Sequence, residues 1–307
     1  MVGQAVRRAL RFLVLGLLLG ALPIGLAAAG QADKIVFVYG DANARGVPLF
    51  LITVAADGSG RTPIVEGASF AYPAWSPDRS QIAFVGDSDC LLAVSADGSG
   101  SHRLARGSCS DSAPTWSPDG RRIAFTRGTS RSSLYVVEAD GSSLRRLSDK
   151  LGFGEGDLSE AWSPDGKRIL FVRLRTAGSS VTGELYTVAP DGSGVRLLYR
   201  PPRGQFVSQA DWAADGRIAL VLARKDGREV LATTGADGKG IRELVRFPAK
   251  QNEQVRGLAF SPDGSKIVYC YFVYHGGEVS ESVLEISVVS VSGGPPEHLF
   301  DGCYPDW

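Results

Sequence analysis

Histidine and methionine are scarce in this chain of 307 residues, which contains three of the first and one of the second. With so few histidines, general acid–base chemistry and metal binding would depend on carboxylates. The sequence also lacks the Gly-x-Ser-x-Gly motif of a hydrolase nucleophile elbow and the Gly-x-x-x-x-Gly-Lys motif of a phosphate-binding loop. These absences disfavour serine hydrolases and P-loop enzymes, and we expect neither a metal nor a cofactor.

Net charge is absent too, because 33 basic residues balance 33 acidic ones. A chain without a net positive field has no general attraction for a polyanion, so nucleic-acid binding is disfavoured. Hydrophobic residues make up 44% of the chain and charged residues 21%, which is the ordinary balance of a globular protein.

A long apolar run stands at the N-terminus. Three arginines within residues 7–11 precede an apolar stretch over residues 12–26, and three alanines and a glycine follow it. This is the layout of a secretory signal, so residues 1–30 are predicted to be a signal peptide and residues 31–307 a single mature domain. An uncleaved membrane anchor is the alternative, because the run extended to Ala29 is just long enough to span a bilayer. We expect a periplasmic or secreted bacterial protein that touches a membrane only if the leader is retained.

The rest of the chain repeats one phrase, seen most clearly in Trp116-Ser117-Pro118-Asp119-Gly120 and the apolar triplet Ile123-Ala124-Phe125. Ser-Pro-Asp-Gly is typical of a tight turn, because Pro presets φ at the second position and Gly accepts the positive φ that closes the turn. A second turn follows at Ala139-Asp140-Gly141-Ser142, so one unit reads as four short strands. The isoleucine after the first turn recurs 41 to 49 residues apart, at Ile35, Ile82, Ile123, Ile169, Ile218 and Ile267. Six such units predict an all-β fold, a six-bladed β-propeller with four antiparallel strands in each blade.

The first unit lacks its opening strand, because the position expected for its aromatic residue falls in the leader, at Ala28. The missing piece stands at the other end of the chain, where Tyr304-Pro305-Asp306-Trp307 repeats the opening strand. We therefore expect the C-terminal strand to join the first blade and close the ring, which removes the exposed edges of an open array.

We name the strands of each blade a to d in chain order. Because their direction alternates, the a–b and c–d turns lie on one face of the disc, the turn face, and the b–c connections and the links between blades lie on the other, the loop face. The loop face carries the sequence variety, with aromatic and arginine residues of the kind that concentrate interface energy. These residues are Phe70, Tyr72, Phe153, Phe206, Tyr274 and Tyr304, with Arg45, Arg131, Arg175, Arg203 and Arg256. The alternative is that the aromatic rings only pack the loops onto the disc.

The units Pro-Thr-Trp-Ser-Pro-Asp-Gly-Arg-Arg-Ile-Ala-Phe and Ala-Asp-Gly-Ser-Ser-Leu-Arg-Arg-Leu resemble the repeats of the TolB family, also called PD40 or WD40-like repeats. The resemblance covers the propeller part only, because TolB carries an α/β domain before its propeller and no such domain fits between Gly30 and Lys34. The resemblance implies the propeller fold and a role in binding, although this scaffold serves many unrelated proteins.

Several repeated residues have a structural and a functional interpretation. The aspartate of each turn could bind calcium, but one carboxylate per turn favours a hydrogen bond to its own turn. The tryptophan of each unit could stack on a sugar, but its fixed place beside the turn favours packing between blades. His102 and His298 fall on outer strands and are expected to be exposed.

Four cysteines complete the set of informative residues, since an exported chain can retain disulfides. Cys90 and Cys109 flank strands c and d of the second blade, and Cys270 and Cys303 flank those of the last blade. We expect the disulfides Cys90–Cys109 and Cys270–Cys303 on the loop face, each worth roughly 3 to 4 kcal/mol if it acts on the unfolded chain.

We expect a monomeric, non-enzymatic binding or scaffold protein of the cell envelope that contacts a protein or peptide partner. The expected binding residues are Tyr72, Phe153, Asp157, Glu160, Phe206, Asp211, Arg256, Tyr274, His275 and Tyr304. The alternative is a propeller lyase or hydrolase acting on a sugar polymer or peptide. It would require Asp157, Glu160, Asp211, Arg256 and His275 to converge at the mouth of the central channel.

Overall fold

A computed structural model describes residues 34–40, 49–67, 70–107, 109–129, 131–148, 155–178, 180–249, 254–274 and 282–307. The chain divides into two compact units, Met1–Ala32 and Asp33–Trp307. The predicted signal peptide lies outside the described residues, which all belong to the second unit. No helix in the described ranges is long and apolar enough to cross a membrane.

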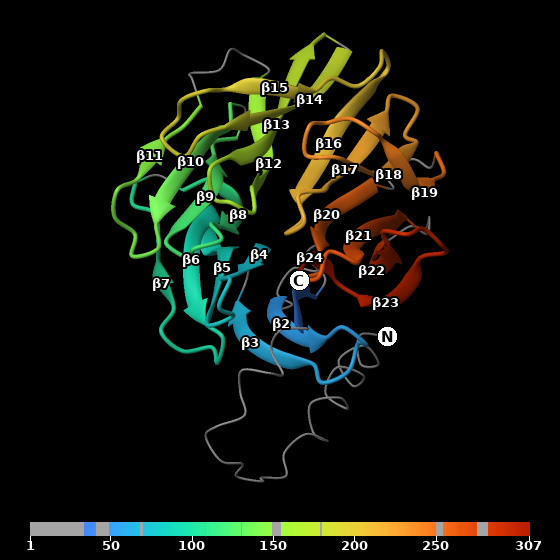
Figure 1. Cartoon of the computed structure of the whole chain (residues 1–307). Helices are drawn as coiled ribbons and strands as arrows, with labels where there is room; N and C mark the ends of the chain where they lie inside the picture. The colour runs from blue at the N-terminus through green and yellow to red at the C-terminus, as the bar shows by residue number, and fades with distance from the viewer. Residues whose placement is uncertain are drawn as a thin grey trace. The chain divides into compact units, whose positions relative to one another are not determined.

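The second unit consists of six antiparallel sheets of four strands each, which confirms the predicted propeller (Figure 1). Blades 1 to 3 are β24 (Cys303–Asp306), β1 (Lys34–Tyr39), β2 (Leu49–Ala55) and β3 (Thr62–Gly67); β4 (Ala71–Trp75), β5 (Gln81–Gly86), β6 (Cys90–Ser95) and β7 (His102–Arg103); and β8 (Asp111–Trp116), β9 (Arg122–Arg127), β10 (Ser133–Glu138) and β11 (Arg145–Arg146). Blades 4 to 6 are β12 (Glu155–Trp162), β13 (Ile169–Ala177), β14 (Ser180–Val188) and β15 (Arg196–Tyr199); β16 (Gln205–Trp212), β17 (Ile218–Arg224), β18 (Glu229–Thr234) and β19 (Arg242–Phe247); and β20 (Gln254–Phe260), β21 (Lys266–Tyr274), β22 (Ser282–Ser290) and β23 (Glu297–Asp301).

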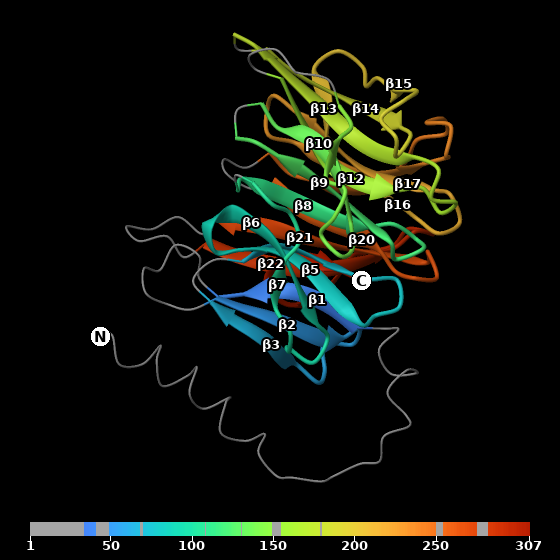
Figure 2. The same ribbon diagram turned by 90° about the vertical axis from the view of Figure 1, so that its left-hand side faces the viewer.

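The C-terminal strand closes the ring as expected. Strand β24 pairs antiparallel with β1, with Val36 opposite Asp306 and Val38 opposite Cys303. The inner strands β24, β4, β8, β12, β16 and β20 each contact the next around the ring, and β20 contacts β24 again. Figure 2 shows the same blades turned by 90°, with β1 to β3 next to β5 and β7. The two ends of the described unit therefore meet in blade 1.

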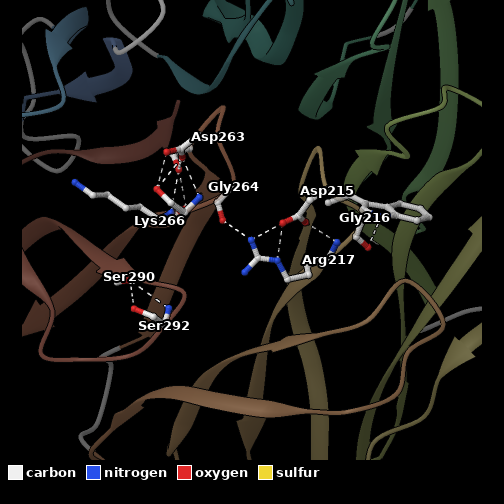
Figure 3. A network of polar contacts seen from close by, with 11 residues as sticks. Asp215, Gly216, Arg217, Asp263, Gly264, Lys266, Ser290 and Ser292 are labelled. Atoms are coloured by element: carbon white, nitrogen blue, oxygen red, sulfur yellow. Dashed lines mark hydrogen bonds and ion pairs between the residues drawn. The ribbon is translucent and has the colours of Figure 1, made fainter.

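The a–b turns are stabilised by the aspartate of each Ser-Pro-Asp-Gly phrase. The Ser117 hydroxyl donates to Asp119 Oδ1 at 2.6 Å, and the Arg121 amide donates to the same oxygen at 3.1 Å. The equivalent bond from Ser261 holds the pKa of Asp263 at about 2. These contacts confirm the turn-stabilising role of the aspartates. In blade 5 the turn also bonds its neighbour: Arg217 pairs with Asp215 and donates to Gly264 O of blade 6 at 2.7 Å (Figure 3).

The repeated tryptophans pack between blades, as predicted. Trp116 Nε1 donates to Ala74 O of blade 2, and Trp162 Nε1 donates to Thr115 O of blade 3, each at 3.2 Å. Both rings are buried, so these bonds anchor blade 3 to blade 2 and blade 4 to blade 3. Trp212 differs, because its Nε1 donates to Gly216 O in its own turn.

Candidate functional site

The inner strands share a β-bulge near their middle. Opposite strand b, one extra residue occurs in β4, β8, β12, β16, β20 and β24. The residue three positions before the aromatic residue that ends each inner strand, or directly follows it in the case of Trp307 after β24, stands in or beside this bulge. These six residues, Tyr72, Ala113, Ser159, Gln209, Gly257 and Tyr304, are called the belt below. Five of them have positive φ, between 48° and 78°, whereas Gln209 does not. A conformation shared by five blades belongs to the scaffold, because bulges commonly place a residue in the left-handed region.

Belt residues bond or touch the next blade. Ser159 Oγ accepts a hydrogen bond from the Ala210 amide at 2.8 Å. Gln209 Oε1 accepts from the Gly257 amide at 2.7 Å, and its Nε2 donates to Val255 O at 3.2 Å. The belt therefore links blades 4, 5 and 6 through the polar side chains of Ser159 and Gln209.

We call the closing strand β24, together with the neighbouring strands of blades 2 and 6, the seam. The belt is aromatic at the seam, where Tyr304 and Tyr72 meet. Their ring centroids are 4.3 Å apart and their planes are tilted by 48°. Burial raises the pKa of both phenols, so both hydroxyls stay protonated at neutral pH. Arg256, on β20, acts electrostatically on both tyrosines and lies over Phe272, 5.0 Å from its centroid. The structure thus brings together three of the residues expected to bind a partner, each half-buried.

The carboxylates of the predicted site have separate roles. Asp157 is buried and accepts two hydrogen bonds from Arg173, at 2.7 and 3.0 Å. Asp211 Oδ2 accepts from the Phe260 amide at 2.8 Å, and burial raises the pKa of this carboxyl. Within the described ranges no hydrogen bond or ion pair joins any two of Asp157, Glu160, Asp211 and Arg256. Asp157 is therefore a structural residue that holds β12 to β13, because its side chain is fully occupied by Arg173.

Glu160 stands out, since four of the other five inner strands have proline or alanine and one has leucine at its position. Its side chain is buried and both carboxyl oxygens lack a hydrogen bond. The neighbouring Thr126 hydroxyl favours the charged form, but it already bonds Ser112 Oγ at 2.7 Å. Burial is the largest effect and raises the pKa of Glu160 well above its ordinary value.

The remaining predicted residues lie apart from this cluster or outside the described ranges. Phe206 is half-buried on β16 beside Gly183 of blade 4, and Phe70 is a core residue with its ring edge against Phe84. For Phe70 the packing interpretation is therefore correct. Arg175 pairs with Glu155 and Glu184. Tyr274 ends β21, where only its backbone is described, and Phe153, His275 and Arg45 lie outside the described residues.

The cysteines follow the expected pairing in one of two cases. Cys90 and Cys109 form a disulfide on the loop face. Cys270 and Cys303 are two buried thiols whose sulfurs lie 3.1 Å apart. The expected place of Cys270 at the loop-face end of strand b is wrong, because β21 extends to Tyr274 and so places Cys270 inside the blade.

A shallow hollow of about 440 Å³ lies on the turn face between blades 2 and 3. Asp78, Asp119, Gln81 and Trp116 are among its lining residues. Both aspartates already accept hydrogen bonds within their own turns. Among the residues placed by the structure, no group of three His, Cys, Asp or Glu could hold a metal ion. His102 and His298 are exposed on outer strands, as expected.

The family profile of PD40, the TolB beta propeller domain, matches residues 30–293. The chain belongs to this TolB propeller family. TolB from Acinetobacter baumannii has a similar structure, with a TM-score of 0.72 and 20% identity over 91% of this chain and 67% of that chain. A putative TolB from Agrobacterium tumefaciens has a TM-score of 0.63 and 17% identity over 88% and 89% of the two chains.

Enzymes share the TolB-like propeller fold as well. An oligogalacturonate lyase in complex with manganese has a TM-score of 0.57 and 12% identity, over 88% of this chain and 74% of that chain. No curated protein matches the sequence significantly. At these identities the likeness concerns the fold, so the function must be argued from this chain's own residues.

The bond-forming belt residues Ser159, Gln209 and Gly257 are absent from the sequence-based site. Their common signal is the position three residues before the aromatic residue that ends or directly follows each inner strand. Counting back three residues from that aromatic residue finds the belt position in every blade.

Proposed function

We propose that this TolB-family chain is an exported, non-enzymatic binding protein of the cell envelope, whose loop face contacts a protein or peptide partner. The cluster of Tyr72, Tyr304 and Arg256 supports this proposal most directly. Aromatic and arginine side chains in a partly desolvated setting are the types that dominate binding energy at interfaces. The TolB-like fold supports a binding or scaffold role more generally.

The location of the partner site follows from the contrast between the two faces. Turn-face aspartates are engaged in their own turns, as Asp140 is with the Ser142 amide at 2.8 Å. Loop-face connections differ between blades and carry the disulfide Cys90–Cys109, which is compatible with export to an oxidising compartment. A partner that binds the loop face would therefore meet the surface that varies between blades.

The test is a crosslinking pull-down with the exported protein, followed by affinity measurement with variants. Tyr72→Ser and Tyr304→Ser copy the residue that blade 4 carries at the same belt position, Ser159, so the fold should be retained. Each variant is expected to weaken binding roughly 10- to 30-fold, which corresponds to about 2 kcal/mol for an anchor residue. Arg256→Ser should act in the same direction.

Matched controls are Ser142→Glu and Ser193→Glu, at exposed positions of the turn face. These changes should leave the affinity unchanged. If the turn-face variants weaken binding and the belt variants do not, the proposed site is on the wrong face.

A second function, catalysis by Glu160, which follows the belt residue Ser159 on β12, is favoured by one observation. Glu160 is a buried carboxyl with a raised pKa and no hydrogen bond, which is the state expected of a general acid. Assays with oligogalacturonate and with peptides, using the parent and Glu160→Gln, would test it. If the parent turned over one of these substrates and Glu160→Gln did not, the protein would be an enzyme and the binding proposal would be wrong.

A further inference from the structure

The seam of the propeller contains a pair of thiols that the binding site does not use. Cys270 lies on β21 of blade 6, and Cys303 begins β24, the strand that completes blade 1. The Cys270 thiol points at Cys303 Sγ, 3.1 Å away, and lies 3.4 Å from Gly302 O. A disulfide has an S–S distance of about 2.0 Å, so bond formation requires an approach of only about 1 Å.

The two sulfurs lie in the apolar cluster that joins the first and last blades. Phe37 and Ile35 of β1, Ile286 of β22 and Trp307 pack in this cluster with both cysteines. Cys270 is fully buried and Cys303 is 4% exposed. An oxidant therefore reaches the thiols only when the four-residue strand β24 separates from its neighbours, or before the ring has closed.

We propose that Cys270 and Cys303 form a redox-sensitive latch, which in its oxidised state ties the closing strand β24 to strand β21 of blade 6. In the reduced state β24 is held by packing in this cluster and by its pairing with β1. The Gly302 amide, just before β24, also donates a 2.7 Å hydrogen bond to Leu284 O of β22. In the oxidised state a covalent bond keeps β24 in place, so β1 can pair with a strand that is already positioned.

The oxidation is a thiol–disulfide exchange with a small disulfide, such as oxidised glutathione, or with a protein disulfide. One cysteine, as thiolate, attacks the oxidant and releases one thiol, forming a mixed disulfide. The second cysteine then attacks that mixed disulfide, forms the Cys270–Cys303 bond and releases the second thiol. Two electrons pass to the oxidant, and the two protons end on its departing thiols.

The latch differs from the Cys90–Cys109 bond in what it connects. Cys90–Cys109 links strand c to the segment after strand d of one blade, on the loop face. Cys270–Cys303 would link two strands that belong to different blades, at the place where the ring closes. It also fixes the residue preceding Tyr304 of the belt.

The test compares the parent with Cys303→Ser, both incubated with oxidised glutathione and then mapped as non-reduced peptides. We expect a Cys270–Cys303 linked peptide in the parent and an intact Cys90–Cys109 bond in both proteins. The oxidised parent should melt several °C above the parent in which this pair is reduced. Any difference in melting temperature between oxidised and reduced Cys303→Ser measures the contribution of Cys90–Cys109. This difference is subtracted from that of the parent.

A second variant guards against a folding defect in Cys303→Ser. Cys270→Ser removes the other sulfur and should give the same redox-insensitive seam. Two unlinked thiols in the oxidised parent, or glutathione attached to each cysteine separately, would overturn the proposal. It would equally be overturned by a linked protein whose melting temperature equals that of the reduced one.

Discussion

Asp306 Oδ2 accepts a 2.7 Å hydrogen bond from the backbone amide of Trp75, 231 positions away in the chain. The same contact recurs between Asp211 and the Phe260 amide, at the equivalent position of blades 5 and 6. Both carboxyls follow the belt by two residues and cap the next inner strand. A third carboxyl, Glu229, accepts from the Val255 amide at 2.6 Å, and burial raises its pKa to about 7. Carboxyl groups thus join neighbouring blades at several points of the ring.

The seam contact predicts a pH dependence of stability. Burial raises the pKa of Asp306 from 3.8 to about 6, while Arg79 opposes the shift and Asp211 adds to it. The folded state therefore keeps a proton that the unfolded chain loses above about pH 4. The stability that this proton on Asp306 contributes is fully present below the pKa of the unfolded chain. It is lost as the pH rises through about 6, the pKa in the folded state.

Asp306→Asn removes the ionisation and keeps an oxygen that can accept from Trp75. We expect the variant and the parent to melt alike near about pH 4, and the variant to be more stable at about pH 8, by on the order of 2 to 3 kcal/mol. Thermal unfolding across this range measures both. If the parent instead became more stable than the Asp306→Asn variant as the pH rises, the effect would have the opposite sign and would contradict the assignment.

The c–d turns pack closely on the preceding blade, and Gly141 shows why. Its φ is +81°, and a Cβ at this position would lie 2.7 Å from Leu104 O of blade 2. Gly194 also has positive φ, +65°, but a Cβ there would meet nothing within 4 Å. Both substitutions to alanine carry the cost of the left-handed conformation, about 1 kcal/mol, but only Gly141→Ala adds the steric contact.

We expect Gly141→Ala to lower the free energy of unfolding by roughly 2 to 4 kcal/mol and Gly194→Ala by about 1 kcal/mol. Chemical denaturation of the two variants gives the difference directly. Equal losses would mean that blade 3 shifts away from blade 2 without cost.

Arg79 occupies the turn position that is glycine in blades 3 to 6, and its φ is +61°. The side chain compensates: Nη1 donates to Lys34 O at 3.1 Å, and the guanidinium lies over the Trp75 ring, 5.4 Å from its centroid. Arg79→Ala loses these contacts and keeps the strain, whereas Arg79→Gly loses the contacts and relieves the strain.

The glycine variant should therefore be more stable than the alanine variant by about 1 kcal/mol, although both lose the arginine contacts. Denaturation midpoints of parent, Arg79→Ala and Arg79→Gly provide the comparison. An alanine variant as stable as the glycine variant would show that the turn adjusts its backbone when arginine is removed.

The sequence by itself determined the hairpins, the number of blades and the closing strand. Ser117, Asp119 and Gly120 lie within four residues of one another, so the turn they build is encoded locally, and its aspartate recurs at Asp78, Asp165, Asp215 and Asp263. The first blade lacked an opening strand and the C-terminal phrase supplied it, which left one way to close the ring. Cys90–Cys109 followed from the same strand order.

The site was decided by tertiary structure, because it depends on contacts between blades. Tyr72 and Tyr304 meet because the ring places their bulges side by side, although they are far apart in the chain. Asp157 was expected at the site, but register sets it opposite Arg173, which occupies both carboxylate oxygens. Glu160 is buried without a hydrogen-bond partner because the packed blades around it exclude water from its carboxyl group. Local turn chemistry can be read from adjacent residues, whereas burial and pairing across blades exist only once the ring has closed.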